Sequence, residues 1–228
     1  GGAGFPTHAK LKGHIDHLIL NGAVCEPLLR TDRYVMKHHA PDIVRAVLAV
    51  RSELDIPRCT IALKGAYREE WAALERAIAA RRAPIALHRL DSFYPAGDEQ
   101  TLVAEVTGQV LPPAGIPLDV GCVVSNVTTM YQIAQALGGI PFTQKYLTVT
   151  GLVRRPTVVK VPLGTPFSFC LELAGGAAVP RWTALSGGPM MGKRLTQEEA
   201  LACFVTKTTS GIVVLPEDSE LVRREGVP

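Results

Sequence analysis

The chain has 228 residues, of which 47% are hydrophobic and 20% are charged, and its formal net charge is +3. This composition is typical of a globular protein with a sizeable core, and it excludes a strongly basic nucleic-acid-binding protein. No apolar run approaches the roughly 20 residues of a membrane span and no signal peptide is visible, so we expect a cytoplasmic protein. The five cysteines form no Cys-x-x-Cys pair, which argues against a zinc site or an iron–sulfur cluster within these residues.

A glycine-rich segment opens the sequence: Gly1-Gly2-Ala3-Gly4-Phe5-Pro6-Thr7, followed by Lys10. Glycines let a backbone approach a ligand closely, and consecutive N–H groups can form an anion site. Lys10 adds a positive charge and Phe5 an aromatic face. The segment therefore either holds the phosphate and ring of a nucleotide-like cofactor or is an ordinary glycine-rich turn, because the common phosphate motifs do not match. Since residue 1 is Gly and not Met, we also expect a piece of a longer chain.

Strands and helices alternate through the first part of the sequence. Apolar runs predict strands at 16–20, 58–63, 85–90 and 120–124, and apolar periodicity predicts helices from Ala40 and over 69–82. Asp98 is expected to cap a helix that ends at Thr107, and Ser125-Asn126 to cap a helix over 127–137. This alternation predicts an α/β domain with a mostly parallel sheet flanked by helices.

Polar residues follow these strands, where open α/β sheets bind their ligands. Asn21, Glu26 and Asp32 follow the first strand, and Asp98 and Glu99 follow the third. Turn and cap chemistry accounts for the same residue types without a ligand.

Two further side chains are given structural roles. His14 and His17 are three residues apart, but no helix and no third ligand accompany them, so we expect no metal site. Trp71 is expected to anchor the core.

The pattern changes near residue 141. Strands are predicted at 146–150, at 157–161 and near Trp182, with a short helix between the last two, capped by Thr165 and ended by Gly175-Gly176. This order resembles a β-grasp module. A capping box at 196–199 and an apolar strand before Pro216 follow. We therefore predict domains at 1–141 and 142–195, and a C-terminal helix-and-strand segment at 196–228.

The ordered set of segments resembles a known family over almost the whole chain. It is similar to the RnfC component of the Rnf electron-transport complex and to the cobalamin reductase of propanediol utilisation, which are related to the NADH-binding flavoprotein of respiratory complex I. The resemblance rests on the opening glycine loop, on Asn21 with Glu26-Pro27, on Tyr94-Pro95-Ala96-Gly97-Asp98-Glu99, on Val124-Ser125-Asn126, and on the later Val-Pro-Leu-Gly-Thr-Pro string. Two departures are Ala23 and Val24, which stand where the complex I family has acids, and a third is Ser125 in place of Asn.

The resemblance implies an FMN- and NADH-binding domain followed by a soluble-ligand-binding β-grasp domain. NADH would reduce FMN, and electrons would pass to iron–sulfur centres expected only beyond Pro228. No catalytic side chain is required, because the flavin carries the chemistry. The FMN-binding residues that the resemblance implies are Gly1, Gly2, Gly4, Lys10, Asn21, Tyr94, Gly97, Asp98, Val124, Ser125 and Asn126. The NADH-binding residues that it implies are Phe5, Glu26 and Glu99.

The implied electron acceptor is cobalamin or a partner protein, in a homo-oligomer or a larger electron-transfer complex. The expected location is the cytoplasm, a bacterial microcompartment or the periphery of the inner membrane. The alternative is a non-catalytic docking or ligand-binding module with a degenerate flavin site, because Ala23 and Val24 lack carboxylates.

Overall fold

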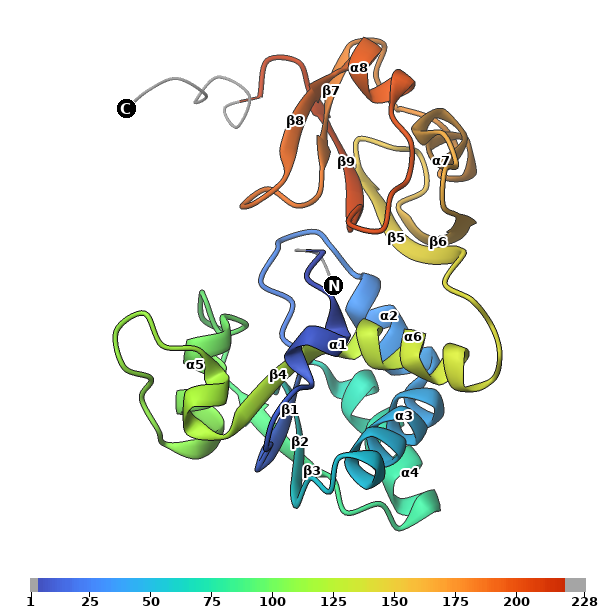
Figure 1. Cartoon of the computed structure of the whole chain (residues 1–228). Coiled ribbons are helices and arrows are strands. Elements are labelled where there is room, and N and C mark those ends of the chain that lie inside the picture. The colour runs from blue at the N-terminus through green and yellow to red at the C-terminus, as the bar shows by residue number, and fades with distance from the viewer. Residues whose placement is uncertain (1–3, 220–228) are drawn as a thin grey trace. The chain divides into compact units, whose positions relative to one another are not determined.

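The computed structural model describes residues 4–219 (Figure 1). Gly1 and Gly2 of the predicted flavin loop therefore lie outside the described residues. The described chain forms two compact units. The first contains residues 5–25 and 32–142, and the second contains Gly4, residues 26–31 and the chain from Thr143 onward.

A parallel sheet forms the centre of the first unit, as predicted. Its strands lie in the order β3-β2-β1-β4, and all three pairings are parallel. The bounds are β1 His17–Asn21, β2 Arg58–Lys64, β3 Ala86–Leu90 and β4 Cys122–Asn126. The chain moves outward from β1 to β3 and then returns to the other side of β1, so the strand order reverses between β1 and β4.

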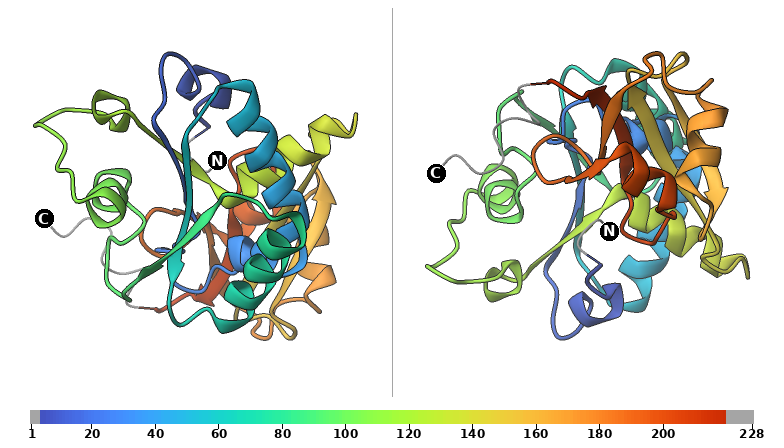
Figure 2. Two further views of the ribbon diagram at one scale, coloured as in Figure 1. Left: turned by 90° about the horizontal axis from the view of Figure 1, so that it is seen from below. Right: turned by 90° about the horizontal axis from the view of Figure 1, so that it is seen from above.

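Helices cover both faces of this sheet (Figures 1 and 2). α5 lies on one face, and α3, α4 and α6 lie on the other. Ile19 and Val124 of the sheet pack with Leu102 and Val103 of α5. Because both faces are buried, the strands are apolar runs without alternation. The bounds are α1 Thr7–Lys10, α2 Thr31–His38, α3 Ala40–Glu53, α4 Arg68–Arg81, α5 Glu99–Thr107 and α6 Val127–Leu137.

The predicted helix ends of the first unit are confirmed. The Asp98 carboxylate accepts hydrogen bonds from the N–H groups of Gln100 and Thr101, and Gly108 ends α5 at φ 74°. Asn126 caps α6 by accepting from the Thr128 N–H at 2.8 Å. β4 begins two residues later than predicted, because Pro117–Val120 forms a short 3-10 helix, η1. Trp71 is half-buried rather than a core residue, and its Nε1 donates to the Lys64 carbonyl.

A mixed five-stranded sheet forms the second unit. The strand order is β6-β5-β9-β7-β8, so β9, from the C-terminal part of the chain, lies at the centre between β5 and β7. The bounds are β5 Gln144–Gly151, β6 Thr157–Pro162, β7 Trp182–Ser186, β8 Lys193–Thr196 and β9 Gly211–Pro216, with α7 Phe167–Leu173 and α8 Gln197–Ala202. Phe167 and Cys170 of α7 pack on the sheet with Leu147 and Ile212.

The helix caps of this unit differ from each other. The capping box between Thr196 and Glu199 is present as predicted. Thr165 does not cap α7: its hydroxyl donates back to the Pro162 carbonyl, and Pro166 occupies the cap position instead.

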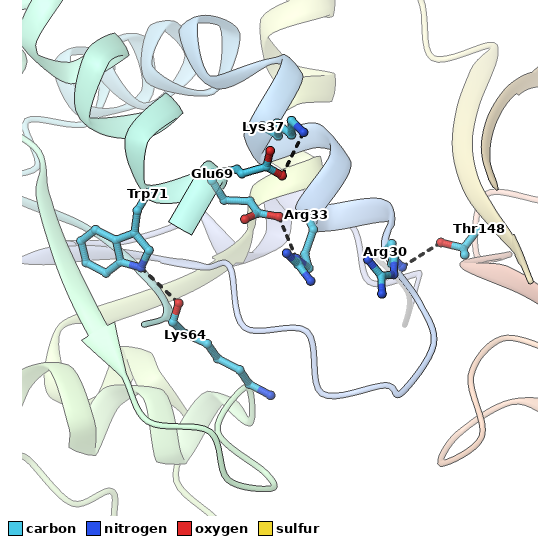
Figure 3. A network of polar contacts seen from close by, with 8 residues as sticks. Arg30, Arg33, Lys37, Lys64, Glu69, Trp71 and Thr148 are labelled. Carbon is cyan, nitrogen blue, oxygen red and sulfur yellow. Dashed lines mark hydrogen bonds and ion pairs between the residues drawn. The ribbon is translucent and has the colours of Figure 1, made fainter. Parts of the chain in front are cut away.

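The segment 26–31 is part of the second unit although it follows β1 in sequence. The Arg30 N–H donates to the Thr148 hydroxyl at 2.9 Å (Figure 3), and the Thr31 hydroxyl donates to the Ser210 carbonyl at 3.3 Å. Leu29 is buried against Gly211, where a Cβ would lie 2.5 Å from its methyl group. Gly211 thus makes room for Leu29.

Among the described residues, no helix is both long enough and apolar enough to cross a membrane.

Candidate functional site

The carboxyl ends of β1 and β4 meet where the strand order of the first sheet reverses. Asn21 is the last residue of β1 and Asn126 the last of β4, and the two are register partners on adjacent strands. A reversal of this kind leaves a crevice outside the carboxyl ends of the strands, which is where open α/β sheets bind ligands. We call this region the carboxyl edge, defined by Asn21, Lys64 and Asn126 at the ends of β1, β2 and β4.

Lys10 and Glu99 form an ion pair beside the carboxyl edge. Lys10 is the last residue of α1 and Glu99 the first of α5, and the lysine ammonium donates to the Glu99 carboxylate. The same ammonium reaches the carbonyl of Val124 in β4, at a longer 3.5 Å. The side chains are 33% and 44% exposed, so solvent reaches both. The structure thus brings together a cation predicted to bind FMN and a carboxylate predicted to bind NADH.

Gly97 is clamped by the loop that follows β1. Its N–H donates to the Cys25 sulfur at 2.9 Å, and its carbonyl accepts from the Asn21 amide at 2.8 Å. A Cβ at this position would lie 2.8 Å from the Ala23 carbonyl oxygen, so no larger residue fits without a shift. The clamp fixes the start of α5 and explains the glycine through contact with the chain itself.

Asn126 is held on both sides of its amide. Its oxygen caps α6, and its nitrogen donates to the Asp32 carboxylate at 2.9 Å. The Thr128 hydroxyl donates to the other Asp32 oxygen at 2.6 Å. Asp32 thereby fixes the strand-to-helix turn that was predicted to contact flavin.

Lys64 is a cation at the carboxyl edge that the sequence analysis missed. Its ammonium donates to the Val24 carbonyl at 3.1 Å, and Tyr67 makes a further hydrogen bond to the Val24 backbone. Burial raises the pKa of the Tyr67 phenol, and the nearby Arg33 guanidinium opposes that shift. Figure 3 shows Lys64 and Arg33 reaching from β2 and α2. The signal available in the sequence was the position of Lys64, at the end of a predicted parallel strand.

Two aromatic side chains of the predicted site are accessible in the first unit. Phe5 is 57% exposed and Tyr94 is 59% exposed. Ser125, in contrast, is buried. Exposed aromatic rings beside a lysine suit a ligand that has both a flat ring and an anionic group.

The two remaining described residues of the prediction lie in the second unit. Gly4 has a φ of 70°, which a side chain would disfavour. The Glu26 carboxylate accepts from the Met190 N–H at 2.9 Å, and its other oxygen is buried without a partner in this structure. Gly188 is required beside it, since a Cβ there would lie 2.2 Å from the carboxylate.

The residues of the carboxyl edge fit a flavin mononucleotide in chemical character. Lys10 supplies a partly exposed ammonium, which suits a phosphate or a polarised ring carbonyl. Asp98, Glu99 and the strand-end carbonyls supply acceptors for ribityl and ribose hydroxyls. Within residues 4–219, no group of three or more His, Cys, Asp or Glu side chains is placed to hold a metal ion.

Comparison with known proteins gives two family matches and several relatives. Residues 1–135 match the Nuo51 FMN-binding domain, and residues 146–194 match the SLBB domain. The chain is 40% identical over 225 residues to "Cobalamin reductase PduS" of Citrobacter freundii, covering 98% of this chain and 49% of that protein. It is 35% identical over 230 residues to the RnfC-type component of the "Na(+)-translocating ferredoxin:NAD(+) oxidoreductase complex" of Acetobacterium woodii, covering 96% and 50%. The chain thus spans about half the length of the curated relatives it matches.

Solved structures share the fold. A chain of the NAD+-reducing [NiFe]-hydrogenase in the air-oxidized state superposes with a TM-score of 0.80 at 22% identity, covering 96% of this chain and 44% of that one. At this level of identity the likeness concerns the fold alone.

Proposed function

Because the chain belongs to the Nuo51 FMN-binding domain family, we propose that it is the flavin-binding part of a longer electron-transfer oxidoreductase. The observation that supports this most directly is the gathering of Lys10, Asn21, Glu99 and Asn126 around the carboxyl edge, where the strand order reverses. These residues come from separate parts of the sequence, and a ligand site at a switch point explains why polar groups meet there.

In this proposal each group has a task. Lys10 binds the FMN phosphate or a polarised oxygen of the ring, and the turn 124–126 presents backbone groups to the cofactor. Tyr94 and Phe5 lie against flat rings. When FMN is bound it supplies the chemistry, since a flavin accepts a hydride and releases electrons one at a time.

Glu99 is proposed to orient NADH. A carboxylate offers two acceptor oxygens, which suit a carboxamide or a ribose hydroxyl. Glu26 was assigned a similar role, but its carboxylate is occupied by the Met190 N–H within the second unit, so Glu99 is the better candidate.

The onward path is proposed from the relatives. Their printed names include a cobalamin reductase and a component of a ferredoxin:NAD(+) oxidoreductase complex. We propose that electrons leave FMN for iron–sulfur centres of the longer protein, and then pass to cobalamin or to a partner protein. The SLBB domain supports that path or binds a soluble ligand.

A docking module without flavin is the second candidate function. The loop after β1 favours it, because Ala23 is buried and Val24 is held through its backbone, so neither side chain offers a carboxylate to a cofactor.

Flavin titration separates the two candidates. We expect the purified chain to quench FMN fluorescence on binding, and NADH added without oxygen to bleach the bound flavin. Lys10→Met should weaken FMN binding, whereas Lys12→Met, an exposed neighbour, should leave it unchanged. Absence of quenching at saturating protein would favour the docking module.

A further inference from the structure

The Lys10–Glu99 ion pair joins two side chains that the proposed function assigns to different ligands. In this structure each satisfies the other, since the ammonium donates directly to the carboxylate. A ligand anion that binds Lys10 must therefore compete with Glu99. A ligand that hydrogen-bonds Glu99 must likewise compete with Lys10.

The two partners are held with different firmness. Glu99 begins α5, whose first turn is fixed by the Asp98 cap and the Gly97 clamp. Lys10 ends α1, a helix of four residues that buries none of them. The second contact of Lys10, to the Val124 carbonyl, is long at 3.5 Å. The lysine is thus the partner that can move away, and Glu99 stays in place.

Glu99 keeps a favourable setting when Lys10 leaves it. It lies in the first turn of α5, where the helix dipole stabilises a negative charge. Its side chain is 44% exposed, so water can also solvate the carboxylate. Opening the pair is therefore inexpensive, because an ion pair with this exposure is held weakly.

We infer that the Lys10–Glu99 pair is an exchangeable lock that couples two ligands, a conclusion that rests on the proposed function. An anionic cofactor draws Lys10 away from Glu99, and the freed carboxylate becomes an acceptor for the second ligand, a nicotinamide nucleotide. FMN and the nucleotide consequently bind with positive cooperativity, and each strengthens the other by the same factor.

The effect of removing the Glu99 charge has a definite sign. Glu99→Gln frees Lys10, so the FMN affinity should rise rather than fall. The rise should be about two- to fivefold, because exposed ion pairs are weak. A residue that merely lined the flavin site would give no change or a loss.

A matched control is available on the same helix. Glu105 is exposed and lies six residues further along α5, about 9 Å away at the usual rise of a helix. Glu105→Gln removes the same charge without removing the acceptor of Lys10, so it should leave the FMN affinity unchanged.

The test measures dissociation constants by flavin fluorescence for the purified chain and its variants. Its second part measures NAD+ binding with and without FMN, because NAD+ occupies the nucleotide site without reducing flavin. In the unmodified chain, FMN should strengthen NAD+ binding about two- to fivefold. In Lys10→Met, Glu99 is already free, so the NAD+ affinity should no longer depend on FMN.

The outcomes distinguish the coupling from the proposed function. Equal FMN affinity in Glu99→Gln and Glu105→Gln, with FMN bound in both, overturns the lock and leaves the flavin function standing. Undiminished coupling between FMN and NAD+ in Lys10→Met also overturns it. If no variant and no unmodified chain binds FMN, the proposed function fails and the lock fails with it.

Discussion

The Arg33–Glu70 ion pair joins α2 to α4 inside the first unit, and removing its cation tests how that packing is stabilised. Arg33 Nε lies 2.7 Å from Glu70 Oε1, and the Arg33 guanidinium lies 4.4 Å from the centre of the Tyr67 ring. The Glu70 side chain is 3% exposed, and its second oxygen is buried without a partner in this structure. Arg33→Met would therefore leave a buried carboxylate without its counter-ion.

The expected cost follows from the burial. Leaving one member of a buried pair uncompensated costs about 3–5 kcal/mol. Arg33 is 28% exposed, so water reaches the site and the cost falls toward the lower end of that range. Loss of the cation–π contact with Tyr67 adds about 0.5–1 kcal/mol. We therefore expect Arg33→Met to lower the free energy of unfolding of the first unit by about 3 kcal/mol.

The chain provides its own control and probe. Lys37 lies one turn further along α2 and pairs with the exposed Glu69 of α4, as Figure 3 shows, so Lys37→Met should cause no measurable loss. The sequence has two tryptophans, Trp71 in the first unit and Trp182 in the second. In a Trp182→Phe background, urea unfolding followed by fluorescence reports on the first unit. Equal losses for Arg33→Met and Lys37→Met would refute the reasoning.

Three further predictions concern pH, loop packing and thiol reactivity. Burial, and then the charge of Arg58, lower the pKa of His17; because the unfolded state binds its proton more readily, stability should fall as the pH drops below about 6.5, and His17→Gln should remove part of that slope in denaturation measured at several pH values. Gly97→Ala should weaken FMN binding through displacement of the loop before α5, whereas Gly108→Ala, which meets no atom within 4 Å, should lower only thermal stability. Burial raises the pKa of the Cys59 thiol to about 11, so mass spectrometry after iodoacetamide treatment should find the half-exposed Cys25 labelled first; equal labelling would contradict this order.

Local rules carried the sequence prediction furthest. The caps at Asp98 and Asn126 depend on side chains that bind backbone a few residues away, and the sequence shows such partners directly. The parallel sheet followed from the alternation of apolar runs with helical periodicity. Thr165 shows the limit of this reasoning, because a nearby carbonyl competed successfully for its hydroxyl.

Partners that lie far apart in sequence were not predictable from any local pattern. Lys10 and Glu99 are 89 residues apart, and their pairing depends on the strand order of the finished sheet. Asp32 reaches Asn126 across a similar separation. The assignment of residues to ligands was therefore made one residue at a time, and it did not reveal that two of them neutralise each other.

The docking of residues 26–31 onto the second unit has a consequence for protein engineering. These residues are encoded between β1 and α2, yet Leu29 has its seat at Gly211 and Glu26 at the Met190 loop. A chimera that exchanges everything after residue 142 would inherit a foreign seat for the native Leu29. Recombination between relatives should therefore succeed only when this short insert travels with the C-terminal half, even though a gene-level boundary places it elsewhere.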